Sequence, residues 1–293
     1  MADINLLTYD IQNMLSTPMG RELSEEVSKE IAVNVGHRMQ RALTRVDRAR
    51  KPGVLFPSEL GHPCDRKTYY EFNYDPATMY PPEEISAQQK FKFTYGDIIE
   101  SLVIPLAKAS GHDVTLVDHT TDWEVHPTSK GGQGWRVRGR IDMVVDGHVV
   151  DVKSMAARSF DRWATDGVKA DGFGYSAQVT SYQYALGNTA QGYILAIDKE
   201  GGKMKLVPTK YEPVQLMAAA KAGANATTAR LAAVPDGKSG NMKLCMTCSY
   251  CKWKAECWRD SNGGAGLRKF IYSFGPIWLT DVFRVLKVTE TPF

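Results

Sequence analysis

The sequence predicts an α/β protein with a central mixed β-sheet flanked by helices. A strand-rich region contains a hairpin signal at Asp146-Gly147, helical patterns lie on both sides of it, and a cysteine-rich segment follows. The predicted order is a helix, three strands, a helix, two strands and a helix. This order is typical of an α/β core, to which an N-terminal helical segment and a C-terminal cysteine-rich segment are added.

Composition is that of an ordinary soluble globular protein. The 293 residues allow one elaborated domain or two, and 43% of them are hydrophobic while 24% are charged. A net charge of +3 does not by itself argue for a nucleic-acid partner. The first residues lack the features of a signal peptide, and the apolar runs are too short to span a bilayer, so we expect a cytoplasmic protein.

A helix is expected over residues 18–50, acidic at first and basic later, within an N-terminal segment of residues 1–54. Arginines three and four positions apart would share one face of it: Arg38, Arg41, Arg45 and Arg48. This stripe either lies along nucleic-acid phosphates or is a solvated helix face, and the sequence favours neither interpretation.

The remaining elements follow from local patterns. A proline-rich loop separates a short helical segment near residues 64–70 from a long predicted helix, in which Pro105 is a candidate kink. Strands are expected over residues 112–117 and 123–125, before the hairpin. The other expected elements are the helix 86–109, the helix 175–186, the strands 192–198 and 203–209, and an alanine-rich helix over 212–233.

The hairpin is the most informative local feature. Asp146 and Gly147 tolerate positive φ, and β-branched residues flank them. Opposite residues in an antiparallel pair share a face, with Cβ atoms roughly 4.5–5.5 Å apart. Two carboxylates so close repel each other, so a purely structural sheet would avoid an Asp–Asp pair. A two-residue loop nevertheless gives the pairs Val145–His148, Val144–Val149, Met143–Val150 and Asp142–Asp151.

Lys153 shares the face of these two aspartates because it lies two residues beyond Asp151. A bound divalent cation would turn the repulsion into a metal site. Two acids and one ammonium are what metal-assisted phosphodiester cleavage needs, since the acids hold the ion and the lysine stabilises charge on the phosphate. The alternative is a surface hairpin with solvated charges.

Three further candidates lie on predicted helices. Gln178 and Tyr182 are four residues apart, so they share a helix face from which an amide and a hydroxyl would orient a phosphate or a catalytic residue. Glu100 would supply a third carboxylate, and Asp97 lies one turn away from it. Each of these signals is weak when taken alone.

The cysteines predict a thiolate site. Four thiolates suit either tetrahedral zinc or an iron–sulfur cluster. Cys248, Cys251 and Cys257 are close in sequence, and the fourth ligand is either the distant Cys64 or the neighbouring Cys245.

These motifs together resemble the PD-(D/E)XK nuclease superfamily. The resemblance is strongest to its RecB-like and AddB-like branch with a four-cysteine iron–sulfur cluster, which includes CRISPR-adaptation-type and phage stand-alone exonucleases. It covers roughly residues 55–260. The motifs that carry it are Gly96 to Glu100, Gly139-Arg-Ile-Asp142, Asp151-Val-Lys153, Gln178 with Tyr182, Cys64 with Arg66, and the set Cys248, Cys251 and Cys257.

The resemblance implies a restriction-endonuclease-like core over residues 55–240 and an iron–sulfur segment over 241–262. It implies a metal-dependent deoxyribonuclease, expected to be an exonuclease in phage or bacterial DNA recombination, degradation or end processing. Lys153 would act on the reacting phosphate, while Gln178 and Tyr182 would orient substrate. Mg²⁺ or Mn²⁺ would be held by Glu100, Asp142, Asp151 and the carbonyl of Val152. A 4Fe–4S cluster, or alternatively Zn²⁺, would be held by Cys64, Cys248, Cys251 and Cys257.

Other expectations concern partners and alternatives. DNA is the expected partner, as single strands or duplex ends, and a homo-oligomer or a recombination partner protein is left open. The apolar tail of residues 263–293 is expected to pack on the core. The alternative function is a DNA-binding accessory protein with a thiolate metal site and an inactive nuclease fold, although the complete set of Asp142, Asp151 and Lys153 argues against decay.

Overall fold

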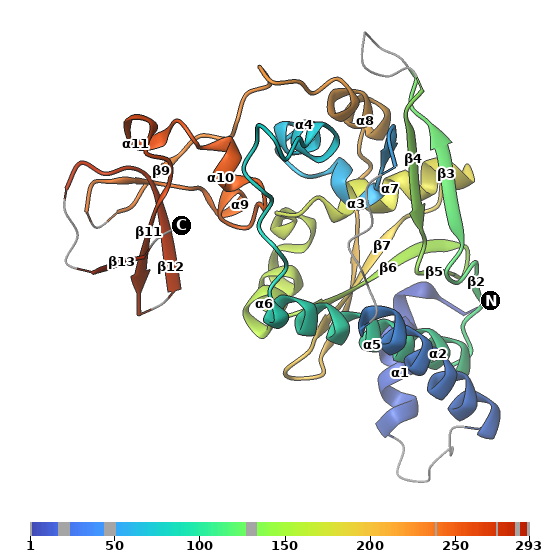
Figure 1. The fold of residues 1–293 in the computed structure, drawn as a ribbon. Helices are drawn as coiled ribbons and strands as arrows, with labels where there is room; N and C mark the ends of the chain where they lie inside the picture. Colours follow the sequence, from blue (N-terminus) through green and yellow to red (C-terminus); the bar gives the residue numbers. More distant parts are fainter. Residues whose placement is uncertain are drawn as a thin grey trace. The chain divides into compact units, whose positions relative to one another are not determined.

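The structure, a computed structural model, forms two compact units (Figure 1). The large unit comprises Met1–His62 and Ser86–Gly223, and the cysteine unit comprises Pro63–Ile85 and Ala224–Phe293. The boundaries predicted at residues 54, 240 and 262, and the packing of the tail on the core, stay predictions. The described residues are 2–16, 24–43, 51–126, 134–237, 239–273, 275–284 and 288–291.

A five-stranded mixed sheet forms the centre of the large unit (Figure 1). Its strand order is β2-β5-β6-β7-β8, in which β6 and β7 run parallel and the other neighbours antiparallel. Every residue of β7 is buried, as expected for a central strand. This arrangement confirms the predicted α/β fold. The strands are β2 (Val114–Thr115), β5 (Met143–Val145), β6 (His148–Met155), β7 (Tyr193–Asp198) and β8 (Met204–Pro208).

Helices cover both faces of this sheet. On one face α1 (Leu7–Ser16) and α5 (Ala87–Ala109) pack against Val145 and Val150. On the other face α6 (Ala157–Asp166) and α7 (Tyr175–Leu186) pack against Val144 and Val149. Alternate residues of the hairpin therefore enter opposite cores, as the pleat of a strand requires.

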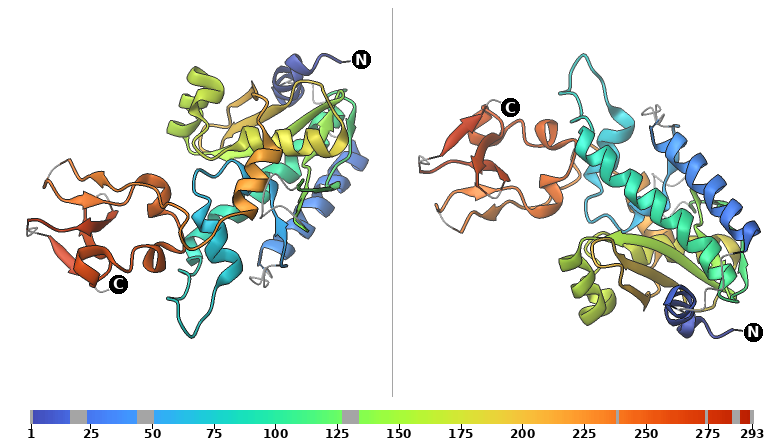
Figure 2. Two further views of the ribbon diagram at one scale, coloured as in Figure 1. Left: turned by 90° about the horizontal axis from the view of Figure 1, so that it is seen from above. Right: turned by 90° about the horizontal axis from the view of Figure 1, so that it is seen from below.

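The large unit contains further elements around this core. Helix α2 (Glu25–Leu43) lies along α5, as Figure 2 shows. A second sheet has the strand order β1-β4-β3. Within the described residues, no helix combines the length and the apolar character that crossing a membrane requires. The remaining elements are η1 (Ile4–Leu6), β1 (Val54–Leu55), α3 (Pro57–Leu60), β3 (Thr120–Glu124), β4 (Arg136–Arg140), η2 (Gly167–Ala170) and α8 (Val214–Ala222).

The predicted hairpin register is confirmed for three of its four pairs, whereas the predicted pair Asp142–Asp151 is not a strand pair because β5 begins at Met143. Asp146 and Gly147 have φ angles of 49° and 83°, so both loop residues are left-handed, as a type I′ turn requires. The strand pairs are Met143–Val150, Val144–Val149 and Val145–His148.

The cysteine unit contains a separate five-stranded sheet that was not predicted from the sequence. Five short antiparallel strands follow the order β13-β11-β12-β10-β9. Leu244, Leu267 and Trp278 form part of its apolar core. These strands are two to seven residues long and carry basic side chains, so the alternation of apolar and polar residues that predicts a strand is weak in them. They are β9 (Val234–Pro235), β10 (Met242–Lys243), β11 (Arg268–Tyr272), β12 (Gly275–Asp281) and β13 (Thr289–Thr291).

Short helices complete the cysteine unit. Helix α4 lies far from the other helices of this unit in the sequence. Its Tyr70 nevertheless stacks on Trp253, with ring centroids 6.0 Å apart. The helices are α4 (Arg66–Asn73), α9 (Met246–Ser249), α10 (Lys254–Cys257) and α11 (Ser261–Gly264).

Some predicted helix boundaries are wrong. The alanine-rich helix was expected to reach residue 233, but α8 ends at Ala222. Gly223 follows, and the side chain of Asn225 then accepts hydrogen bonds from the backbone and hydroxyl of Thr227. Such local side-chain bonds compete with helix continuation. Helices α1 and α6 were not predicted, and the parts of the predicted 18–50 helix beyond 24–43 lie outside the described residues.

Candidate active site

The hairpin brings Asp142 and Asp151 to one end of the central sheet. Asp151 lies within β6 and is completely buried. Asp142 directly precedes β5, and its Oδ2 accepts the backbone N–H of Val152 at 2.8 Å. Lys153 reaches back to Asp151, with Nζ 2.5 Å from Oδ2. Asp151 and Lys153 therefore share a face of β6, and Asp142 lies next to them just before β5, outside the strand.

Helix α7 holds Asp151 from the opposite side. Nε2 of Gln178 donates to Oδ1 of Asp151 at 2.8 Å and lies 3.1 Å from the hydroxyl oxygen of Tyr182. Gln178 and Tyr182 thus share a helix face, as predicted, and in this structure they orient the aspartate. Within the described residues, the buried Oε1 of Gln178 has no hydrogen-bond partner.

Glu100 lies near these acids but is bound to an arginine. Its Oε1 is 2.5 Å from a terminal nitrogen of Arg38, whose other terminal nitrogen donates to Asp118 at 2.9 Å. Arg38 is only 6% exposed. The solvated-face interpretation of the basic stripe is therefore wrong at Arg38, and the phosphate interpretation stays a prediction. Arg41 is exposed, while Arg45 and Arg48 lie outside the described residues.

Burial and mutual repulsion govern the electrostatics of this cluster. Burial, and then the carboxylate of Asp142, raise the pKa of Glu100 against the opposing effect of Arg38. Burial also raises the pKa of Asp151, although Lys153 lowers it. Burial alone would lower the pKa of Lys153, but Asp151 and Asp142 overcome this effect and raise it. The lysine is therefore held as a cation beside Asp151, whose burial disfavours ionisation.

The oxygen atoms of the predicted ligands Asp142, Asp151, Glu100 and Val152 suit a hard divalent cation only in part. Carboxylate and carbonyl oxygens are the ligands that Mg²⁺ and Mn²⁺ prefer. Oδ2 of Asp151 is buried and receives no well-oriented hydrogen bond from the described residues, although Nζ of Lys153 is close to it. Among the described side chains, however, no three His, Cys, Asp or Glu are gathered as a metal-binding group. Asp142 and Asp151 fit a cation, whereas Glu100 as a third ligand stays a prediction.

Sequence reasoning missed two residues near the site, Tyr175 beside Lys153 and Asp171 at the start of α7. The ring of Tyr175 lies 5.0 Å from Nζ, and burial raises the pKa of its hydroxyl. Asp171 accepts the backbone N–H groups that begin α7, including those of Tyr175 at 3.0 Å and Ser176 at 2.8 Å. An aspartate just ahead of a predicted helix is a recognisable capping signal, so Asp171 was within reach of the sequence.

The start of α7 also depends on a close approach between two glycines. A Cβ atom placed on Gly174 would lie 2.3 Å from the Cα of Gly61, at the end of α3. Gly174 in addition has a φ of 80°, which side chains rarely adopt. Two glycines are therefore required where α3 meets the helix that carries Gln178.

The cysteine unit brings all five thiols into mutual interaction. Burial, and then a hydrogen bond with Cys245, raise the pKa of Cys248, to which Cys64 and Cys251 also contribute. Burial raises the pKa of Cys257 to about 11. None of the five described cysteines forms a disulfide. Thiolates of this number suit zinc or an iron–sulfur cluster, yet the described residues contain no preassembled metal-binding group, and the choice between Cys64 and Cys245 stays open.

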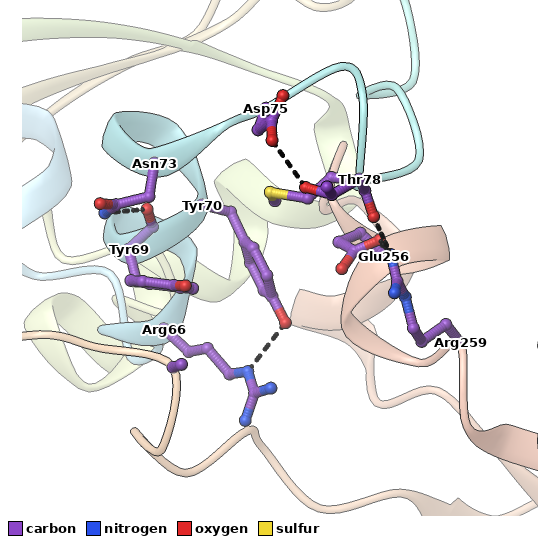
Figure 3. Close-up of a pocket in the computed structure, with 10 residues that line it drawn as sticks. Arg66, Tyr69, Tyr70, Asn73, Asp75, Thr78, Glu256 and Arg259 are labelled. Carbon is purple, nitrogen blue, oxygen red and sulfur yellow. Dashed lines mark hydrogen bonds and ion pairs between the residues drawn. The ribbon is translucent and has the colours of Figure 1, made fainter.

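A cavity of about 460 Å³ also lies in the cysteine unit (Figure 3). Nε of Arg66 donates to the Tyr70 hydroxyl at 3.0 Å, and Arg259 donates to the carbonyl of Thr78 at 2.9 Å while pairing with Glu256. The polar groups of its lining are thus engaged with one another, and the cavity indicates no particular ligand.

Comparison with known proteins agrees with the site in the large unit. Residues 122–254 match the model of a family described as a PDDEXK-like domain of unknown function (DUF3799). The match supports the PD-(D/E)XK superfamily. It indicates a nuclease-type function, and it contains Asp142, Asp151, Lys153, Gln178 and Tyr182. The matched residues begin after Cys64 and Glu100 and end before Cys257.

Other comparisons add little. No curated protein matches the chain. Among solved structures the chain is similar to the crystal structure of SSO0001, with a TM-score of 0.43 and 14% sequence identity. That similarity covers 65% of this chain and 83% of the other, and at this level it supports no further argument.

Proposed function

We propose that this protein is a divalent-metal-dependent deoxyribonuclease that acts as an exonuclease on DNA ends. The grouping of Asp142, Asp151 and Lys153 at one end of the central sheet carries the proposal. Solvated surface charges, the alternative interpretation of the same motif, do not agree with the complete burial of Asp151. A role in phage or bacterial DNA recombination, degradation or end processing rests on the family resemblance.

In this proposal the acids hold Mg²⁺ or Mn²⁺. Asp142 and Asp151 would bind the ion, together with the carbonyl of Val152 and with Glu100. When bound, the ion supplies an activated water and stabilises negative charge on the phosphate. The N–H of Val152 fixes the carboxylate of Asp142, and Gln178 fixes that of Asp151.

Lys153 would stabilise the reacting phosphate. Its ammonium is kept protonated by the two aspartates, so it is suited to donate hydrogen bonds to a phosphate oxygen as negative charge develops there. Gln178 and Tyr182 would then act mainly as positioning residues, because Gln178 donates to Asp151 and Tyr182 accepts a hydrogen bond from Gln178.

In the cysteine unit we propose a structural 4Fe–4S cluster on Cys64, Cys248, Cys251 and Cys257. The interactions of Cys64 with the later cysteines support a site that joins two distant segments of the chain. Zn²⁺ is the alternative. Visible absorption of protein purified without oxygen separates the two, because a zinc thiolate site is colourless.

The test is cleavage of linear DNA labelled separately at each end, with Mg²⁺ or Mn²⁺, by the wild type and by Lys153→Ala. We expect ion-dependent release of label from one end by the wild type, and a loss of at least about 10³-fold in the variant, since charge stabilisation at the phosphate is removed. Thermal melting controls for folding. Full activity of Lys153→Ala would exclude this active site.

A wild type that binds DNA but never cleaves it would instead support the accessory-protein function. The same experiment repeated on single-stranded and duplex substrates gives the polarity and the strand preference.

A further inference from the structure

An aromatic side chain lies exposed beside the candidate lysine. Phe173 presents 57% of its surface to solvent. Its ring stacks on Tyr175, with centroids 5.7 Å apart and planes inclined by 24°. Tyr175 in turn lies 5.0 Å from Nζ of Lys153. The exposed ring of Phe173 is thus linked to the lysine through one other ring.

The backbone that carries Phe173 is firmly held. One carboxylate oxygen of Asp171 accepts the N–H groups of Phe173 at 3.2 Å and Gly174 at 2.8 Å. The ring of Tyr175 also contacts the buried Trp163, with centroids 5.9 Å apart. An exposed ring on an ordered support loses little conformational freedom when a ligand stacks on it.

The position of this ring indicates its ligand. If Lys153 faces the scissile phosphate, the bases attached to the neighbouring nucleotides lie close to that phosphate. The flat face of an aromatic side chain stacks on any base and is therefore tolerant of sequence. A base inside a duplex is already stacked and paired, so only an unpaired base can use a ring of the protein in this way.

We infer that Phe173 is a stacking platform for an unpaired nucleobase next to the scissile phosphate. The inference rests on the proposed nuclease function and deepens it, because it selects single-stranded DNA or frayed ends as the substrate. Phe173 then contributes to substrate affinity, while Asp142, Asp151 and Lys153 carry the chemistry.

The test compares steady-state cleavage of a single-stranded oligonucleotide by the wild type, Phe173→Ala and Phe173→Trp. Base stacking on an aromatic residue predicts a KM about tenfold higher for Phe173→Ala, a nearly unchanged kcat, and recovery in Phe173→Trp. The matched control is Tyr9→Ala, which removes another exposed ring, on α1 at the opposite face of the sheet. All variants should melt at the wild-type temperature.

A second substrate carries a single abasic nucleotide, placed in turn at each position around the cleaved bond. At one position we expect the abasic nucleotide to slow cleavage by the wild type as much as the Phe173→Ala substitution slows cleavage of the intact strand. The same abasic nucleotide should not slow the Phe173→Ala variant further, because base and ring act as one pair. Equal KM values, or the same abasic penalty in both proteins, would overturn the inference while leaving the proposed function intact. A wild type that cleaves no DNA would remove both.

Discussion

The active-site hairpin and the cysteine cluster contain similar numbers of candidate ligands, but the two sites are supported very differently. Each candidate carboxylate of the active site is held by a protein group: Asp142 by Val152 and Asp151 by Gln178 and Lys153, both in the hairpin, and Glu100 on α5 by Arg38. Cys248 shares a hydrogen bond with Cys245, Cys251 with the backbone of Trp253, and Cys257 with Tyr70. Burial raises the pKa of Cys248, Cys251 and Cys257, which favours their neutral thiol form. The hairpin acids are therefore held by charged and polar groups of the protein, whereas the proposed cluster would itself bind the buried cysteines as thiolates and hold the cysteine unit together.

This difference predicts the largest effect at the cysteines. Cys248→Ser should remove the visible absorption of the cluster and lower the melting temperature of the cysteine unit by about 10 °C or more, because binding energy at a structural metal site is folding energy. Absorption spectra and calorimetry of anaerobically purified protein measure both effects.

A matched pair of variants sharpens this prediction. Cys64→Ser should behave like Cys248→Ser, while Cys245→Ser should keep the absorption, if Cys64 is the fourth ligand. The reverse result would assign the ligand to Cys245, and unchanged spectra in all three variants would disprove a thiolate cluster.

At the hairpin, removal of a supporting group should reduce activity without unfolding the protein. Gln178→Leu should lower kcat/KM by about 10–100-fold, since groups that orient metal ligands have effects of this size. Tyr182→Phe is the control, because it keeps the bond between Gln178 and Asp151 and should cost less. Cleavage assays rank the two variants, and a larger loss in Tyr182→Phe would show that the tyrosine hydroxyl has a role of its own.

The smallest expected effect is a dependence of stability on pH. Glu100 and Asp151 have raised pKa values in the folded protein. At a pH above the ordinary pKa of a carboxyl group, the folded state therefore binds more protons than the unfolded state. Metal-free protein should therefore lose stability as the pH rises, melting a few degrees (about 2–5 °C) lower at pH 8 than at pH 6.

Added Mg²⁺ should reverse this loss at pH 8, because the ion binds only the ionised acids. In Asp151→Asn the pH dependence should become weaker, since one of the two groups no longer titrates. A melting temperature that rises from pH 6 to pH 8 without metal would contradict the raised pKa values.

The parts of the fold that sequence predicts well are those set by local signals. The Asp146-Gly147 loop fixed the register of the hairpin, and periodicity placed the helices Ala87–Ala109 and Tyr175–Leu186 almost to the residue. The grouping of Asp142, Asp151 and Lys153 follows directly from that register. The match to the PDDEXK-like family agrees with this part of the chain.

The parts that escaped prediction depend on contacts between distant residues. Nothing around Arg38 indicates that it will pair with Glu100, 62 positions later, rather than face solvent. The stacking of Phe173 and Tyr175 beside Lys153 depends on how the start of α7 meets β6. The C-terminal strands are too short to show a clear period before they pair.

The cysteine unit is built from two segments that are far apart in the sequence, and this has a consequence for synthesis on the ribosome. Residues 63–85 emerge about 140 residues before the rest of their unit, which begins at Ala224. Trp253 is 183 positions after Tyr70, so at about 5–20 residues per second α4 waits roughly 9–37 s before Trp253 can cover Tyr70. During this interval the nascent large unit can begin to fold on either side of an unfinished insertion, so the cysteine unit is the last part of the protein to mature.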